Sequence, residues 1–121
     1  MSAEQTCKHL LVWQEAINLV VMVYRQTKTF PREEAYGLAG QAQRAAVSVP
    51  ANIAEGNGRK STAEYLNFLS IANGSLLELE THLLIAERLG YMDESKMASL
   101  QSQLDTVGRL LTGLRKSLRK E

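Results

Sequence analysis

Residues 61–90 read STAEYLNFLSIANGSLLELETHLLIAERLG, and this stretch decides the fold. Ser61 and Glu64 have the spacing of a capping box, whose side chains satisfy the free backbone N–H groups at a helix start. Between them and Gly90, a typical C-terminal cap, apolar residues recur in steps of three and four and share one helix face. That line is Tyr65, Leu69, Ala72, Leu76, Leu79, Leu83 and Ala86. The pattern predicts a helix over residues 61–89.

The segment that follows has the pattern of an outer helix, over residues 93–118. Its apolar residues again alternate in threes and fours, and nearly all the others are polar. The apolar line is Met97, Leu100, Leu104, Val107, Leu111, Leu114 and Leu118. One narrow apolar stripe indicates a helix that packs on a core with one face only.

Residues 33–56 predict a helix with a core-facing side of small residues. This side consists of Leu38, Ala39, Ala42, Ala45, Ala46, Val49, Ala51, Ile53 and Ala54. Small side chains let a neighbouring helix come close. Pro50 lacks a backbone donor, so we expect a kink there. Because the apolar register continues past the proline, we do not expect a break.

Residues 10–28 predict a helix with an unusually wide apolar arc. One line is Leu10, Trp13, Ile17, Val20 and Tyr24, and a second is Val12, Ala16, Leu19 and Val23. One neighbouring groove cannot cover such an arc, and a large exposed apolar patch usually marks an interface. We therefore expect contact with another copy of the chain.

Four helices in 121 residues predict a single all-α domain over residues 1–121. The connections of about three to six residues favour antiparallel neighbours. The expected architecture is an antiparallel up-down-up-down four-helix bundle.

The sequence also indicates where the protein works. Cys7 is the one cysteine, so no internal disulfide can form. The N-terminus lacks the pattern of a signal peptide, and the longest apolar run, residues 19–24, is far too short to cross a bilayer. We expect a soluble cytoplasmic protein with no membrane partner.

Catalytic and metal-binding patterns are missing from the sequence. A di-iron bundle needs paired Glu-x-x-His motifs, and neither His9 nor His82 has a glutamate three residues before it. Glu78 and His82 share a helix face without a complete ligand set. There is no nucleophile motif and no phosphate-binding loop. We predict no catalytic residue, no cofactor and no metal, which leaves an enzyme as a distant third hypothesis.

The net charge of +1 is unevenly distributed. Residues 61–95 carry six acids and one base, giving −5, whereas residues 109–121 carry five bases and one acid, giving +4. Candidate residues for binding nucleic acid or a partner form a C-terminal group (Arg109, Arg115, Lys116, Arg119 and Lys120) and a group in and after residues 33–56 (Arg44, Arg59 and Lys60). We expect Glu55 to pair with Arg59, four residues on. Cations at a helix C-terminus also stabilise the helix dipole, which is the simpler interpretation of the C-terminal group.

Polar residues also form one line along the helix predicted over residues 33–56. The line is Glu34, Gln41, Arg44, Ser48, Asn52, Glu55 and Arg59. One interpretation is a solvated face. The other is a hydrogen-bonded seam against another helix or subunit, with Gln41, Ser48, Asn52 and Glu55 as its candidate members.

Ten stretches between residues 12 and 91 together carry a family resemblance. They are Val12-Trp13-Gln14 with Ala16; Phe30-Pro31 with Glu34; Tyr36-Gly37-Leu38 with Gln41; Arg44-Ala45-Ala46-Val47-Ser48 with Pro50; Asn52-Ile53-Ala54-Glu55-Gly56 with Gly58-Arg59 and Ser61; Glu64; Phe68-Leu69; Ile71-Ala72; Gly74-Ser75-Leu76 with Glu78; and Leu89-Gly90-Tyr91. The chain resembles the bacterial four-helix bundle proteins encoded in intervening sequences of 23S ribosomal RNA genes. Where that family often has two adjacent basic residues, this chain has Gln43-Arg44.

The resemblance implies a ring-shaped homopentamer. It also implies kinship with the accessory protein of diversity-generating retroelements, which binds a reverse transcriptase and nucleic acid through a basic surface. The leading hypothesis is a non-enzymatic oligomeric bundle that binds RNA, DNA or a nucleic-acid-associated protein. The alternative is a purely structural self-assembling scaffold.

Overall fold

The computed structural model describes residues 10–120, and the predicted all-α four-helix class is confirmed. The elements are α2 (Leu11–Thr27), the short 3-10 helix η1 (Arg32–Glu34), α3 (Leu38–Asn57), α4 (Thr62–Arg88) and α5 (Glu94–Arg119). No strand occurs within residues 10–120. None of the described helices is apolar over a length that would cross a membrane.

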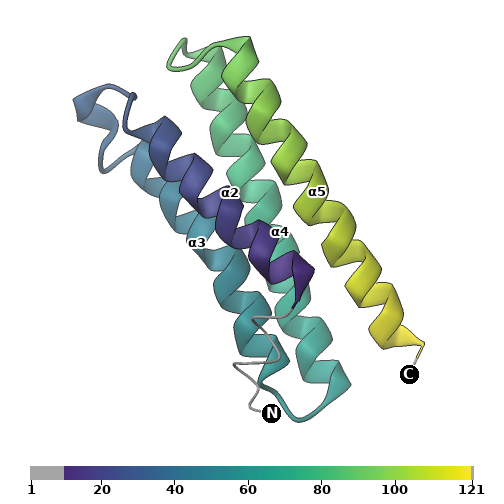
Figure 1. The fold of residues 1–121 in the computed structure, drawn as a ribbon. Helices are drawn as coiled ribbons and strands as arrows, with labels where there is room; N and C mark the ends of the chain where they lie inside the picture. Colours follow the sequence, from purple (N-terminus) through teal and green to yellow (C-terminus); the bar gives the residue numbers. More distant parts are fainter. Residues whose placement is uncertain (1–9, 121) are drawn as a thin grey trace.

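The helices form a closed bundle in which each packs on the next along the chain and α2 also packs on α5. Of these pairs, α3 and α4 pack most extensively. The diagonal pairs of described helices, α2 with α4 and α3 with α5, make no close backbone contact. The ribbon reverses direction at the connection around residues 58–61 and again around residues 89–93 (Figure 1).

The core contains large side chains from all four helices, and α3 adds a series of small ones. Leu19, Leu79 and Leu111 are fully buried, as are Ala42 and Ala46 on α3. The expectation that small residues of α3 face the core is therefore confirmed for the first half of the helix. It is wrong for Ala51 and Ala54, which are exposed because they lie on the outer side of α3.

Gly56 lies at a close approach of α3 and α4. A Cβ atom at this position would lie 2.8 Å from Cβ of Phe68 and 3.0 Å from Cδ1 of Tyr65. Both distances are shorter than ordinary carbon–carbon contact, so a side chain here would push the helices apart. The absent side chain thus lets the end of α3 rest on the first turns of α4.

The predicted start of α4 at Ser61 is confirmed. The hydroxyl of Ser61 accepts a hydrogen bond from the backbone N–H of Glu64 at 3.1 Å and donates one to the Glu64 carboxylate at 3.2 Å. Asp93 caps α5 in the same way, accepting from the N–H of Lys96 at 2.8 Å. These caps satisfy backbone donors that a helix start leaves free.

Gly90 ends α4 with a positive φ of 82°. Its N–H bonds to the carbonyl of Glu87, and the N–H of Tyr91 bonds to the carbonyl of Ala86, both at 2.9 Å. This pair of bonds is the Schellman arrangement, in which a left-handed residue closes the last turn. The predicted end of α4 is thus confirmed within one residue.

The prediction of a helix from residue 33 is wrong at its start. Residues 32–34 form the separate turn η1, and α3 begins at Leu38. The carboxylate of Glu34 accepts a hydrogen bond from the N–H of Leu38 at 3.1 Å. Glu34 therefore satisfies a free donor at the start of α3 from outside the helix, and it is not part of a polar line along it.

Pro50 lies inside α3, as the sequence predicts, and the helix continues through it. Its side chain is buried. The apolar register of Ala42, Ala46, Val49 and Ile53 is kept on both sides of the proline, because all four are buried without exposure to solvent.

Candidate nucleic-acid interface and docking surfaces

Two groups of cations meet at one end of the bundle. We define the basic end as Arg59 and Lys60, in the connection before α4, together with Arg115, Lys116, Arg119 and Lys120, in the last turns of α5. Figure 1 shows this connection and the end of α5 at the same end of the molecule. A contact between the two helices supports the placement, since Nη2 of Arg115 lies 3.5 Å from the hydroxyl of Ser70 on α4.

The α5 cations of the basic end face little opposing charge. Residues 109–120 contain five bases and no acid. Lys116, Arg119 and Lys120 are exposed, and no carboxylate of residues 10–120 lies within ion-pair distance of them. Lys116 and Arg119 occupy the last turn, where positive charge also favours the helix dipole. Stabilising the helix still leaves these three side chains available to an external anion.

The α3 group is different, because its members are separated or paired. Arg59 forms an ion pair with Glu55, as predicted, and its guanidinium carbon lies 4.8 Å from the centre of the Phe68 ring. Arg44 is exposed on α3 fifteen residues earlier, roughly 20 Å away along the helix. Lys60 is exposed beside Arg59. The fold therefore brings Arg59 and Lys60, and not Arg44, to the basic end.

Arg109 also lies apart from the basic end. It precedes Arg115 by six residues, or roughly 9 Å along the axis of α5. Its Nη2 atom lies 3.4 Å from the hydroxyl of Thr106 on the same helix. Arg109 is exposed and lines a groove between α4 and α5 instead.

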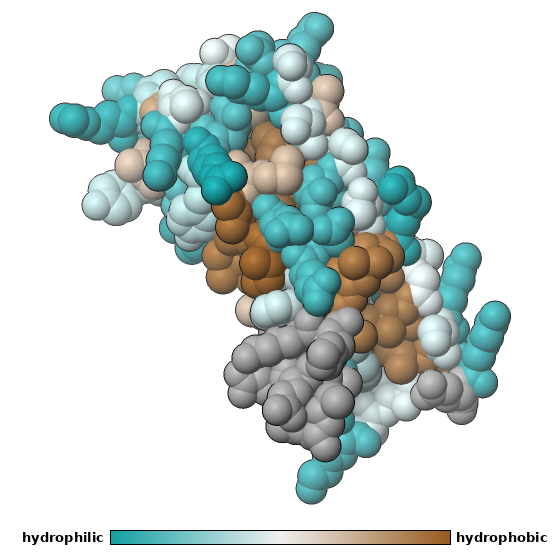
Figure 2. Space-filling model, viewed as in Figure 1, coloured by the Kyte–Doolittle hydropathy of each residue, from teal (hydrophilic) through white to brown (hydrophobic). Residues whose placement is uncertain are grey.

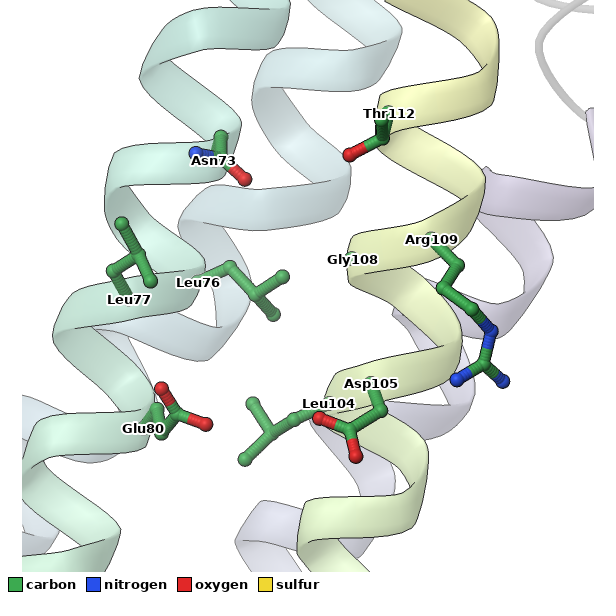
Figure 3. Close-up of a pocket in the computed structure, with 9 residues that line it drawn as sticks. All are labelled: Asn73, Leu76, Leu77, Glu80, Leu104, Asp105, Gly108, Arg109 and Thr112. Carbon is green, nitrogen blue, oxygen red and sulfur yellow. The ribbon is translucent and has the colours of Figure 1, made fainter.

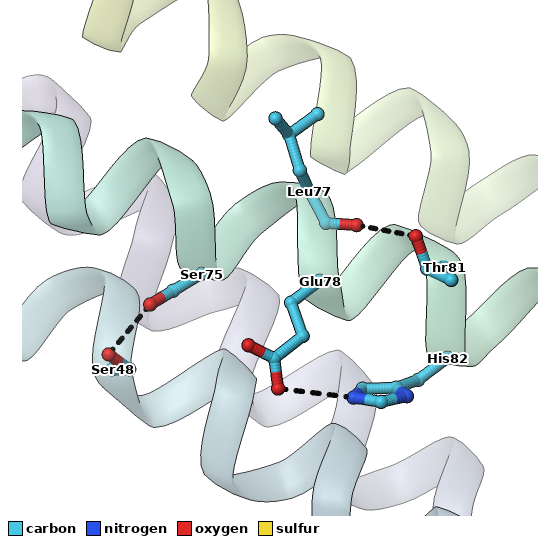
Figure 4. Close-up of polar contacts among 6 residues, drawn as sticks. All are labelled: Ser48, Ser75, Leu77, Glu78, Thr81 and His82. Atoms are coloured by element: carbon cyan, nitrogen blue, oxygen red, sulfur yellow. Dashed lines mark hydrogen bonds and ion pairs between the residues drawn. The ribbon is translucent and has the colours of Figure 1, made fainter.

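The polar line of α3 divides into an interhelical part and a solvated part. The hydroxyl of Ser48 lies 2.8 Å from that of Ser75 on α4 (Figure 4). The side-chain amide of Asn52 donates to the Ser48 carbonyl at 2.8 Å and to the Ser48 hydroxyl at 3.0 Å. Gln41 and Glu55 are exposed. The middle of the line is thus a seam against α4, and its ends face solvent.

Next to this seam, Nε2 of His82 lies 3.3 Å from the Glu78 carboxylate (Figure 4). Both residues belong to α4, so the pair adds no ligand from another helix. Within residues 10–120, no three histidine, cysteine or acidic side chains come together as a metal site.

A groove of about 510 Å³ lies between α4 and α5, and it was not predicted from the sequence (Figure 3). Its lining residues are Asn73, Leu76, Leu77, Glu80, Leu104, Asp105, Gly108, Arg109 and Thr112. Its two acidic lining residues both accept from the side-chain amide of Gln101, Glu80 at 2.6 Å and Asp105 at 3.0 Å. The sequence signal was Gly108 inside a helix pattern, since a missing side chain there leaves space beside Leu76.

Exposed apolar side chains are concentrated on α4 more than on α2. Four residues of α4 and its C-cap are large, apolar and exposed: Ile71, Leu77, Leu84, Ile85 and Leu89. We call these five residues the outer surface of α4. Doublets such as Leu76-Leu77 and Leu84-Ile85 were the signal, because adjacent helix residues cannot all face one core.

The wide arc of α2 is covered in part by its own bundle. Val12, Ala16, Leu19 and Val23 are buried, whereas Trp13 and Val20 are half-buried against the core. Leu11, Val21 and Tyr24 are exposed. On the face that α2 and α5 present in Figure 2, apolar surface gathers in patches between hydrophilic side chains.

Comparison with known proteins adds a family to this architecture. No curated protein matches the sequence. A crystal structure of a protein with unknown function from the S23 ribosomal protein family of Bacteroides thetaiotaomicron VPI-5482 is similar, with a TM-score of 0.81 and 24% identity over 88% of this chain and 99% of that one. At this identity the similarity shows the fold alone. The family model described as 23S rRNA-intervening sequence protein matches residues 8–113. The chain therefore belongs to the 23S rRNA-intervening sequence protein family.

Proposed function

We propose that the protein is a non-enzymatic helical bundle that binds RNA through its basic end and works as a homo-oligomer in the cytoplasm. The observation that carries the RNA part is the basic end itself, where exposed cations on α5 have no acidic neighbour in residues 109–120. The name of the family, which refers to 23S rRNA, supports RNA as the first nucleic acid to test.

The recognition we propose depends on phosphate and is independent of base sequence. Lysine and arginine contacts to phosphate position a nucleic acid without reading its bases. Residues 109–120 contain no aromatic side chain on which a base could stack. Phe68, near the basic end, is covered by the guanidinium of Arg59. Unrelated RNA sequences of equal length should therefore bind with similar affinity.

Assembly would multiply this modest charge. The outer surface of α4 supports a homo-oligomer, because five large exposed apolar residues on one helix and its C-cap favour burial against another chain. We propose five subunits, which is the ring implied by the family resemblance. In a ring the basic end repeats once per subunit, so weak phosphate contacts add through effective concentration.

The test is a filter-binding titration of the intact protein with a single-stranded RNA of about 20 nucleotides over a salt series. For single strands, each neutralised phosphate contributes a slope of about −0.7 in log affinity against log salt. Three to five phosphate contacts thus predict a slope on the order of −2 to −4. Duplex DNA in a parallel titration separates a general polyanion binder from an RNA binder.

A structural scaffold is the second candidate, because the outer surface of α4 supports self-association whether or not the protein binds RNA. Absence of RNA binding at low salt, with an oligomer present in light scattering, would support the scaffold and refute the RNA proposal. Retention of a nucleic-acid-associated protein without direct RNA binding would assign the basic end to a protein partner.

A further inference from the structure

Arg115 differs from the other cations of the basic end. Its side chain is half-buried between α5 and α4, whereas Lys116, Arg119 and Lys120 are exposed. Its Nε atom is enclosed by protein and has no hydrogen-bond partner. The contact between Nη2 and the Ser70 hydroxyl, at 3.5 Å, is long for a hydrogen bond. No carboxylate of residues 10–120 pairs with this guanidinium.

A partly desolvated guanidinium without an anion is an unfavourable arrangement. Arginine presents five N–H donors in a planar fork and has no acceptor. Partial burial removes some of the water that would satisfy them, which costs free energy unless an anion or acceptor replaces it. The described part of the chain supplies one distant hydroxyl. The terminal guanidinium nitrogens therefore lack a strong acceptor within residues 10–120, and an external anion would supply one to them, whereas the enclosed Nε atom lies out of its reach.

The surroundings of Arg115 match the chemistry of a phosphate group. Ser70 is exposed on α4 and its hydroxyl can donate to a phosphate oxygen. Arg119 follows one turn later on the same face of α5, and Asn67 precedes Ser70 by about one turn on α4. Both are exposed. By helical spacing, donors from two helices thus flank the contact between Arg115 and Ser70, and arginine binds phosphate through two parallel hydrogen bonds.

We propose that Arg115, assisted by Ser70, is the anchoring phosphate site of the protein. The inference rests on the proposed RNA-binding function and assigns its principal contact to one side chain. Lys116, Arg119 and Lys120 then contribute long-range attraction, because an exposed lysine or arginine acts mainly as a mobile charge. Arg115 is held in position before the ligand arrives, so its fork loses less conformational freedom on binding.

A purely structural role for Arg115 makes a different prediction. Its aliphatic part could simply cover the junction of α5 and α4, as long charged side chains often do. Replacement by glutamine would then lower the thermal stability. It would reduce the affinity for RNA only as much as the removal of any other single positive charge. Binding and unfolding must therefore be measured on the same variants.

The experiment compares R115Q, R115K and S70A with K120Q in the full chain, using fluorescence anisotropy with a labelled 20-nucleotide poly(U) RNA over a salt series. K120Q is the matched control, since it removes one exposed charge from the same end of α5. We expect R115Q to lose about tenfold or more in affinity and K120Q about two- to threefold, in line with bidentate and single phosphate contacts. R115K keeps the charge and loses the fork, so it should lower affinity several-fold with an unchanged salt slope.

Each outcome decides between the two proposals. If R115K binds RNA like the wild type, or if R115Q loses no more affinity than K120Q, the anchoring role is wrong although RNA binding by the basic end stands.

If the wild type does not bind RNA, the proposed function fails, and thermal unfolding with inorganic pyrophosphate then tests the anion site alone. Stabilisation of the wild type but not of R115K or S70A would support a site for free phosphate. Equal melting temperatures with and without pyrophosphate would overturn the site. Circular dichroism verifies folding, and R115K and S70A remain informative if R115Q is unfolded.

Discussion

The hydroxyl of Tyr91 donates a hydrogen bond to the carboxylate of Glu34 at 2.8 Å and so joins two connections that lie 57 residues apart in the chain. The same carboxylate caps the start of α3 through the N–H of Leu38. The rings of Phe30 and Tyr91, with centres 5.5 Å apart, reinforce this contact. One acidic side chain therefore holds together the end of the bundle opposite the basic end.

This contact predicts an acid-sensitive stability. The Leu38 N–H and then the Tyr91 hydroxyl lower the pKa of Glu34 from its ordinary value of 4.5, against the opposing effect of burial. A depressed folded-state pKa stabilises the protein above the unfolded pKa, and this stabilisation is lost as the pH falls through the folded value. We expect E34Q to flatten the pH dependence of the urea midpoint below about pH 5. Y91F should flatten it less, because the Leu38 contact remains. A midpoint with the same acid dependence in E34Q and wild type would contradict this.

Tyr91 should titrate in the opposite region. The hydrogen bond to Glu34, followed by burial and the charges of Glu34 and Glu33, raises the pKa of Tyr91 above 10.0. Its contribution to stability is present below the unfolded pKa and is lost as the pH rises through the folded value. Ultraviolet titration of the wild type should show a tyrosine that ionises above the ordinary tyrosine pKa. This late titration should disappear in Y91F, and its persistence would assign it to another residue.

The cap of α4 can be measured with a single substitution. S61A removes the acceptor for the Glu64 N–H and should lower the free energy of unfolding by about 0.5–2 kcal/mol. S61D is the matched control, since aspartate is an equally good cap and should retain most of the stability. An unchanged urea midpoint in S61A would show that the cap contributes nothing.

Two helical glycines should respond in opposite directions to the same change. G56A places a Cβ atom against Phe68 and Tyr65, and we expect a loss of roughly 1–3 kcal/mol in unfolding free energy. G74A meets no atom within 4 Å and should gain about 0.5–1 kcal/mol, because alanine favours a helix more than glycine does. Urea unfolding at low protein concentration makes this comparison. Similar effects from both variants would contradict the close approach of α3 and α4.

The outer surface of α4 predicts which substitutions should make the oligomer dissociate into monomers. I71E with I85E places two carboxylates on this surface, where each side chain is already about 45% exposed in one chain. We expect light scattering to show an oligomer for the wild type and a folded monomer for the double variant. V21E tests the alternative, in which the exposed apolar residues of α2 form the contact between subunits. A wild-type monomer at micromolar concentration would refute the assembly, and disruption by V21E alone would move it to α2.

The two basic groups differ in their predicted contribution to RNA binding. Replacing Arg115, Lys116, Arg119 and Lys120 by glutamine should weaken RNA binding strongly and reduce the magnitude of the salt slope. R44Q with R59Q should have a smaller effect, because Arg44 lies far from the basic end and Arg59 already pairs with Glu55. Both comparisons use unrelated RNA sequences. Unchanged affinity and slope in the fourfold variant would refute the placement.

Helical period explains why most of the fold could be predicted. The line from Leu69 to Ala86 is buried as expected, since a repeat of three and four leaves one choice of inner face. The start of α3 could not be found in this way. Residues 33–36 suit a helix locally, yet Glu34 is held outside it by Tyr91, which lies in a distant connection. A contact between segments far apart in the chain does not change the spacing of apolar residues within either segment, so this spacing cannot reveal it.

The residues of the candidate site could be predicted from the sequence more readily than which of them lie together. Sequence identified all the cations of the basic end, and an up-down bundle already implies that the end of α5 meets the connection before α4. The pairing of Ser48 with Ser75 was one of two open interpretations, because a polar line on one helix does not reveal its partner. The exposure of Leu77 and Ile85 was missed, since periodicity alone assigns leucine and isoleucine to a core.

The alanines of α3 give the bundle an uneven tolerance to random mutation. Ala42 and Ala46 are fully buried against neighbouring helices, so almost any replacement adds volume where none is free. A library selected for folding should admit little beyond glycine and serine at these positions. Leu79 and Leu83 have more interchangeable alternatives, because isoleucine and methionine fill similar volumes. We therefore expect amino-acid substitutions to accumulate most slowly at the buried positions with the smallest side chains.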